Sequence, residues 1–206
     1  SRRVGSSSDD SEEPEAGGTP SFISSDLELA EDGGTRQRVG LRFNKITIPP
    51  RALIVNASIT FTADSAQTGA ALILTFMGEL NRDPGNFTTV SRDLVDRQNT
   101  TARVNWISIP NWATGANYTT PNLAPIFQEI INHSEWTNGS PIVIFVHGNS
   151  RTVLRKAYSY DTNPQLAATL NITYRTPEYL LSRYDTDQGF KLWLSPDGTL
   201  AAGLDD

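Results

Sequence analysis

The 206-residue chain has no cysteine, which excludes disulfide bonds, thiolate metal sites and cysteine nucleophiles. It has only two histidines, His133 and His147, and neither belongs to an H-E-x-x-H motif. The chain also lacks the G-x-S-x-G motif of α/β-hydrolases, and its predicted strands do not alternate with helices. These absences predict that the protein is not an enzyme.

Basic residues are also scarce, with 17 Lys and Arg against 23 Asp and Glu, so the net charge is −6. A nucleic-acid partner requires a stripe of basic side chains to contact phosphates, so we expect none. No apolar run approaches the length of about 18 residues that a membrane-spanning helix needs, and we expect no membrane span. The sequence shows no apolar segment of signal-peptide type. Either the protein is cytosolic or its signal peptide has been removed.

The sequence is rich in the pattern Asn-x-Ser/Thr, which is the acceptor motif for N-linked glycans. The Asn, Ser and Thr content predicts about 2.7 such motifs by chance, whereas the chain contains seven. A β-protein rich in Asn and Thr can also generate them by accident. The glycan interpretation predicts covalent N-linked glycans and an extracellular or cell-surface location. The acceptor residues are Asn56, Asn86, Asn99, Asn117, Asn132, Asn138 and Asn171.

Most of the chain alternates between apolar and polar residues, which is typical of half-buried strands. In the clearest segment, 54–63, Ala57, Ile59, Phe61 and Ala63 are predicted to point inward. Residues 80–101 are rich in Asn, Asp, Pro and Gly and are predicted to form a loop. The predicted strands are 22–29, 39–43 with continuation through Ile46 and Ile48, 54–63, 71–77, 104–108, 142–146, 153–160 and 166–174, the last with Leu170, Ile172 and Tyr174 inward and Asn171 and Thr173 outward.

One segment has the spacing of an amphipathic helix, with Thr120 as its cap and Pro121 in its first turn. Its apolar positions follow a period of 3.6 residues, at Leu123, Ile126, Phe127, Ile130 and Ile131. Many short strands, long loops and a single short helix predict an all-β fold, specifically an antiparallel jelly-roll β-sandwich.

The chain is long enough for one domain and an appendage. We predict a jelly-roll domain over residues 1–175 and a carboxy-terminal extension over residues 176–206. In the extension, Phe190, Leu192, Trp193 and Leu194 are predicted to form a strand outside the completed sandwich. Such a strand either folds back on its own sheet edge or pairs with the edge of another copy as an inter-subunit strand.

Residues 1–20 are polar and acidic, which alone is typical of a disordered tail. Carboxylates in this segment and in the predicted strand 22–29 would repel one another if the two segments pair. A Ca²⁺ ion held by oxygen ligands would relieve that repulsion, whereas a solvated acidic edge would need no ion. No cofactor is required, and structural calcium is the one candidate. Its candidate ligands are Asp9, Asp10, Glu12, Asp26, Glu28 and Asp161.

Tryptophans cluster near the loop that precedes the helix. If exposed, Trp106 and Trp112 would form a flat platform on which sugar rings stack. The alternative is that both indoles pack in the core.

The order of several motifs resembles secreted microbial jelly-roll domains of the DNRLRE type, which belong with carbohydrate-binding modules. The motifs are Ser6–Glu13, Ser24–Leu29, Val39–Phe43, Thr120–Ile131 with Trp136, Ala157–Asp161 and Leu170-x-Ile-x-Tyr174, within about residues 4–175. The chain is also similar, more loosely, to subunits of glycosylated helical filaments from freshwater samples. In those filaments a terminal β-segment joins each protomer to the next, which implies that residues 1–20 belong to the domain.

Two functions follow as expectations. The first is a structural subunit of an extracellular glycosylated helical filament, a homopolymer assembled head to tail by β-strand addition. A heterologous contact that does not close on itself generates such a helix. The alternative is a carbohydrate-binding module of a secreted protein.

Overall fold

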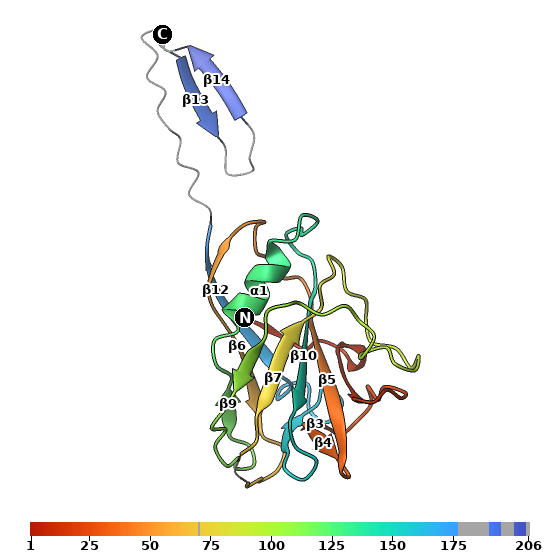
Figure 1. Cartoon of the computed structure of the whole chain (residues 1–206). Coiled ribbons are helices and arrows are strands. Elements are labelled where there is room, and N and C mark those ends of the chain that lie inside the picture. Colours follow the sequence, from red (N-terminus) through yellow and green to blue (C-terminus); the bar gives the residue numbers. More distant parts are fainter. Residues whose placement is uncertain (70, 177–189, 195–199, 205–206) are drawn as a thin grey trace. The chain divides into compact units, whose positions relative to one another are not determined.

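A computed structural model describes residues 1–69 and 71–176, and the backbone of residues 190–194 and 200–204 (Figure 1). The chain divides into two compact units, Ser1–Arg175 and Thr176–Asp206. The described residues of the first unit form twelve strands, one α-helix and a short 3₁₀ turn, η1. The strands are β1 (Arg2–Arg3), β2 (Asp10–Pro14), β3 (Asp26–Leu29), β4 (Glu31–Asp32), β5 (Thr35–Phe43), β6 (Leu53–Thr62), β7 (Leu74–Gly78), β8 (Val104–Trp106), β9 (Asn117–Thr119), β10 (Ile142–Gly148), β11 (Arg155–Tyr158) and β12 (Thr169–Arg175); η1 is Ser7–Asp9 and α1 is Ala124–Ile131.

Two antiparallel sheets pack face to face. Sheet A has the strand order β1-β12-β6-β9, and sheet B has the order β2-β5-β10-β7-β8 with β4 also paired to β5. The pair β3-β11 forms a separate two-stranded sheet. The chain changes sheet from β5 to β6, from β6 to β7, from β8 to β9 and from β9 to β10. The predicted antiparallel β-sandwich with one short helix is confirmed.

The main core lies between the two sheets and takes alternate residues from β5, β6 and β10. Ala57, Ile59, Phe61 and Ala63 are fully buried, as the alternation predicted. Inward residues of sheet B oppose them, including Leu41. Burying one such aliphatic or aromatic side chain contributes roughly 1.5–3 kcal/mol.

The helix α1 packs against β6 and β7 with its predicted apolar side. All five predicted apolar positions are buried. The predicted start was wrong by about one turn, because Leu123 is the residue that precedes α1 and Pro125 lies in its first turn. Thr120 does not cap the helix. Its hydroxyl oxygen accepts a hydrogen bond from the Ile59 N–H at 3.1 Å, which ties the loop to β6.

Two strand predictions fail where the backbone is irregular. Lys45 has a φ of 55°, so β5 ends at Phe43, although Ile46 and Ile48 are still buried. The register of β12 against β6 shifts between Thr173 and Tyr174. Tyr174 is therefore 37% exposed rather than inward. Other predicted strands form with shorter or shifted ends.

Residues 1–20 are part of the sandwich and not a tail. The strand β1 pairs with β12, and β2 pairs with β5, with Asp10 opposite Leu41. Asp9, Asp10 and Glu13 are at most 2% exposed. Composition alone could not predict that residues 1–20 are ordered, because their pairing depends on partners that are distant in sequence.

The second unit contains a hairpin. The strands β13 (Phe190–Leu194) and β14 (Leu200–Leu204) pair antiparallel. Four register pairs join apolar residues only: Phe190 with Leu204, Leu192 with Ala202, Trp193 with Ala201, and Leu194 with Leu200.

Within the described parts of the chain, no helix has the length and apolarity needed to cross a membrane.

Candidate functional site

The glycan acceptor residues lie at the surface. Six of the seven asparagines are exposed, and Asn99 is partly buried. The Oδ1 atom of Asn99 is buried and has no hydrogen-bond partner among the described residues. A glycan attaches to the Nδ2 atom of asparagine, and at Asn86 this atom donates to Ser8 Oγ at 2.6 Å and to Asp9 Oδ1 at 3.3 Å, so a glycan there would remove one of these two bonds.

Three of these acceptors share the outward face of sheet A. Asn171 on β12 lies opposite Ser58, and Asn56 on β6 lies opposite Thr173, so each asparagine faces the hydroxyl residue of the other acceptor motif. On the other side of β6, the Thr62 hydroxyl donates to Asn117 Oδ1 at 2.9 Å. We name this surface the sequon face. It consists of Asn56, Ser58, Thr60, Thr62, Asn117, Thr119, Asn171 and Thr173, and it holds no charged side chain.

The outward face of sheet B is covered by residues 80–101, which we name the covering loop. Phe87 and Leu94 of this loop form a second small core with Met77, Val143 and Phe145. A Cβ atom at Gly40 would lie 2.5 Å from the Phe87 ring, so the close approach of the loop requires glycine there.

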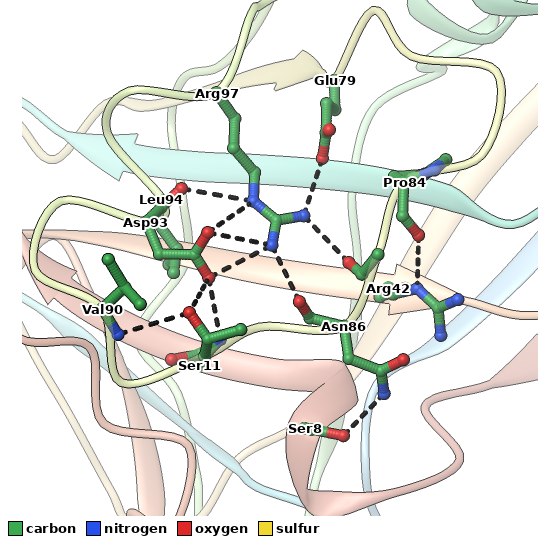
Figure 2. Close-up of polar contacts among 12 residues, drawn as sticks. Ser8, Ser11, Arg42, Glu79, Pro84, Asn86, Val90, Asp93, Leu94 and Arg97 are labelled. Carbon is green, nitrogen blue, oxygen red and sulfur yellow. Dashed lines mark hydrogen bonds and ion pairs between the residues drawn. The ribbon is translucent and has the colours of Figure 1, made fainter.

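Arg97 holds the covering loop in place (Figure 2). Its guanidinium donates to Glu79 at 3.0 Å and to Asp93 at 3.1 Å, and it also donates to the backbone carbonyls of Gly85 and Asn86. The Asn86 side-chain amide donates to the Ser8 hydroxyl at 2.6 Å. One glycan acceptor is thus integrated into the polar contacts between the loop and the amino-terminal segment.

Glu13 fixes the loop from beneath. Its carboxylate accepts hydrogen bonds from the backbone N–H groups of Leu94 at 2.8 Å and Val95 at 3.1 Å. The side chain of Glu13 is fully buried. Glu13, which composition alone would assign to a disordered tail, therefore holds the covering loop against sheet B.

The predicted calcium ligands do not gather at one point. Asp9 pairs with Arg42 at 2.7 Å. Asp26 and Glu28 both pair with the Lys156 ammonium at 2.7 Å. Among residues 1–69 and 71–176, no three Asp, Glu or His side chains are grouped as a metal site requires. Arg42 and Lys156 thus supply the positive charge next to three of the six predicted ligands, Asp9, Asp26 and Glu28.

Asp161 and the remaining two carboxylates have separate partners. Asp161 accepts a hydrogen bond from the Ser7 hydroxyl at 2.6 Å. Burial raises the pKa of Asp10 to about 7, although the Tyr160 N–H donates to it. Burial, then contact with Glu28, raises the pKa of Glu12 to about 8. A proton on each carboxyl thus relieves the repulsion near neutral pH.

The tryptophans proposed as a sugar platform lie in the core. Trp106 is 7% exposed and Trp112 is 2% exposed. The Trp112 ring stacks on Tyr118 with 4.7 Å between centroids. Neither indole presents an open face, so sugar stacking on them does not fit the structure. The sequence shows where a tryptophan is, but not which side of the sheet it faces.

A groove beside β12 was not anticipated from the sequence. The two-residue strand β1 pairs only with Thr169 and Leu170 of β12. Within the described chain, residues 171–175 therefore have a paired neighbour only on the β6 side. A groove of about 100 Å³ lies beside this edge. It is lined by Ser1, Arg2, Ile46, Thr47, Ile48, Leu170, Ile172 and Tyr174.

Ile46 and Ile48 gave the only sequence signal for this groove, and it was misinterpreted. Their alternation predicted that the preceding strand continues. In the structure they leave sheet B after Phe43 and line the groove beside β12. The Tyr174 hydroxyl donates to the Thr47 carbonyl at 3.1 Å, so the tyrosine bridges the two sides.

Comparison of the chain with known protein families and with curated proteins found no match. The resemblance to jelly-roll carbohydrate-binding domains and to filament subunits therefore stays a prediction.

Proposed function

We propose that the protein is an extracellular, N-glycosylated structural subunit that assembles with copies of itself by β-strand addition. The observation that carries this proposal is the separate carboxy-terminal unit with its hairpin. A two-stranded hairpin is at best marginally stable alone in water. Apolar pairs such as Phe190 with Leu204 therefore need a further surface to cover them.

Assembly follows if each copy donates this segment and also accepts one. Donor and acceptor surfaces are then different, so the contact is heterologous and the chain of copies does not close. The product is a helical filament whose length depends on protein concentration.

The surface position of the asparagines supports the extracellular part of the proposal. A glycan cannot be buried, and accidental motifs would also fall on inward strand positions. On β6 and β12 the acceptors Asn56 and Asn171 occupy outward positions.

Carbohydrate binding, the alternative function, has no comparable support among the described residues. The two candidate tryptophans are buried. Substitution of Trp112 by Ala is therefore expected to destabilise the core rather than to remove a sugar contact.

Deletion of residues 177–206 tests the proposal. The remaining sandwich has a complete core, so folded monomers are expected in negative-stain micrographs where the full chain forms threads. A matched pair of substitutions on β13 refines the test. Leu192→Ser should shorten the threads, and Lys191→Ser, at the neighbouring position, should leave them intact. Threads of normal length from the truncated chain would refute the proposal.

A further inference from the structure

The surface is hollowed beside one of the glycan acceptors. The hollow has a volume of about 370 Å³ and includes Asn138, Gly139 and Ser140, the three residues of one acceptor motif. We infer that this hollow binds the first sugar ring of a glycan attached to Asn138. The inference rests on the proposed function and assigns a binding site to one of its glycans. The other lining residues are Arg82, Asp83, Glu135, Thr137 and Pro141.

Hydrogen bonds hold the acceptor motif in a turn, residues 137–140. The Ser140 N–H donates to the Thr137 carbonyl at 3.2 Å, and the hydroxyl oxygens of these two residues lie 2.8 Å apart. Gly139 has a φ of 97°, which residues with a side chain rarely adopt. The Gly139 N–H donates to the Ile46 carbonyl at 2.9 Å, and the Ile46 N–H donates to the Ser140 carbonyl at 3.2 Å. A fixed attachment point lowers the conformational entropy that a bound sugar ring loses.

The lining of the hollow suits a neutral sugar ring. Arg82 and Asp83 belong to the covering loop, and Glu135 belongs to the segment that follows α1. A guanidinium donates hydrogen bonds and carboxylates accept them, so ring hydroxyl and acetamido groups find both kinds of partner. Two acidic groups against one basic group disfavour an anionic ligand. The volume is near the lower end of the roughly 300–1,000 Å³ of small-molecule pockets, which suits one ring rather than a long oligosaccharide.

Covalent attachment removes the need for high affinity. None of the described residues that line the hollow is aromatic, so the ring has no flat side chain to stack on. A free sugar is therefore expected to bind only weakly. A short tether, however, holds a ligand at an effective concentration in the roughly millimolar range, so a dissociation constant in that range already keeps the ring bound for about half of the time. A bound ring would join the covering loop to the turn 137–140.

Substitution of Arg82 tests these contacts. The full-length chain is produced with glycans by secretion from a eukaryotic host and without glycans in the bacterial cytosol, each with and without Arg82→Ala. Arg82 is exposed, so the substitution should leave the melting midpoint of the unglycosylated chain unchanged. In the glycosylated chain it should lower the midpoint by about 2–4 °C, because a sugar contact of hydrogen-bond strength is lost.

Two acceptor variants serve as matched controls. Asn138→Gln removes the glycan beside the hollow, whereas Asn132→Gln removes a nearby glycan whose asparagine does not line it. The effect of Arg82→Ala on the glycosylated chain should vanish in the Asn138→Gln background and persist in the Asn132→Gln background. This cycle isolates the coupling between Arg82 and the glycan on Asn138.

Three results would overturn the inference. They are equal midpoint shifts with and without glycans, a shift that survives Asn138→Gln, and a peptide map in which other acceptors carry glycans but Asn138 carries none. In each case the proposed function still stands if the same samples form threads in negative stain. A secreted chain without any glycan would overturn both this inference and the extracellular part of the proposed function. Absence of threads at every concentration would refute assembly whatever the state of Asn138.

Discussion

The two outward faces of the sandwich differ in what covers them. On sheet B, outward Val143 and Phe145 are fully buried beneath the covering loop. On sheet A, the sequon face is polar, uncharged and open to glycans. The difference shows that one face is completed by the chain's own loop. The other stays open and carries the acceptor motifs at which we propose covalent glycans.

The pH dependence of stability is expected to be the largest effect, and we assign it to two buried carboxyls of β2, Asp10 and Glu12. Folding raises the pKa of Asp10 from 3.8 to about 7 and that of Glu12 from 4.5 to about 8. The folded state thus binds more protons than the unfolded state between about pH 4 and pH 8. The free energy of unfolding should fall as pH rises through this window, by up to about 1.4 kcal/mol per pH unit for each group.

Urea unfolding at a series of pH values measures that slope. The double variant Asp10→Asn, Glu12→Gln should flatten it. Thr60→Ala on the sequon face, where no group titrates, should leave it unchanged. A wild-type protein that gains stability from pH 5 to pH 8 would contradict the assignment of these buried carboxyls.

Removing an anchor of the covering loop should have the next largest effect on stability. Phe87 is 2% exposed and packs on Phe145. Phe87→Ala is expected to lower the free energy of unfolding by about 3 kcal/mol, because a buried aromatic ring is lost and a cavity remains. Ser58→Ala on the sequon face should change it by less than about 0.5 kcal/mol. Chemical denaturation measures both variants. If Phe87→Ala and Ser58→Ala lowered the free energy of unfolding equally, the two faces would not differ in this way.

The ion pairs of the covering loop should contribute somewhat less to the free energy of unfolding than Phe87 does. Arg97→Ala leaves the carboxylates of Glu79 and Asp93 without their guanidinium partner. The free energy of unfolding is expected to fall by about 2 kcal/mol, since both acids are largely buried. Arg92→Ala removes an exposed pair with Asp96 and should have no measurable effect. Thermal melts of both variants distinguish the two arginines, and a silent Arg97→Ala would contradict this role.

The smallest effect on stability is expected on the sequon face itself. Asn56→Gln and Asn171→Gln each remove one acceptor, so the mass of the secreted protein should drop by one glycan per substitution. The unfolding free energy of the unglycosylated protein should change by less than about 0.5 kcal/mol, because both side chains are exposed. Intact-protein mass spectrometry gives the result. An unchanged mass would show that these positions carry no sugar.

The contrast between the two faces was partly visible in the sequence. Residues Asn56–Thr62 alternate between polar and apolar, which predicts a strand with one open face. Residues Ile142–Val146 are continuously apolar, which indicates a strand buried on both faces. The pattern did not identify residues 80–101 as the cover, because loops lack the periodicity that links a strand to its partner.

The remaining errors share one physical cause. Glu13, Arg42 and Lys156 acquire their roles from partners far away in the sequence. Burial of Trp112 and the end of β5 likewise depend on packing and on backbone conformation at Lys45. Local spacing predicted the strands and the helix, whereas the pairing partners required the tertiary structure.

Sedimentation velocity of the full-length chain over a range of concentrations tests the central claim most directly. Strand exchange between copies predicts an open-ended series of species whose average mass rises with concentration. A single species at every concentration, whether monomer or closed dimer, would contradict it.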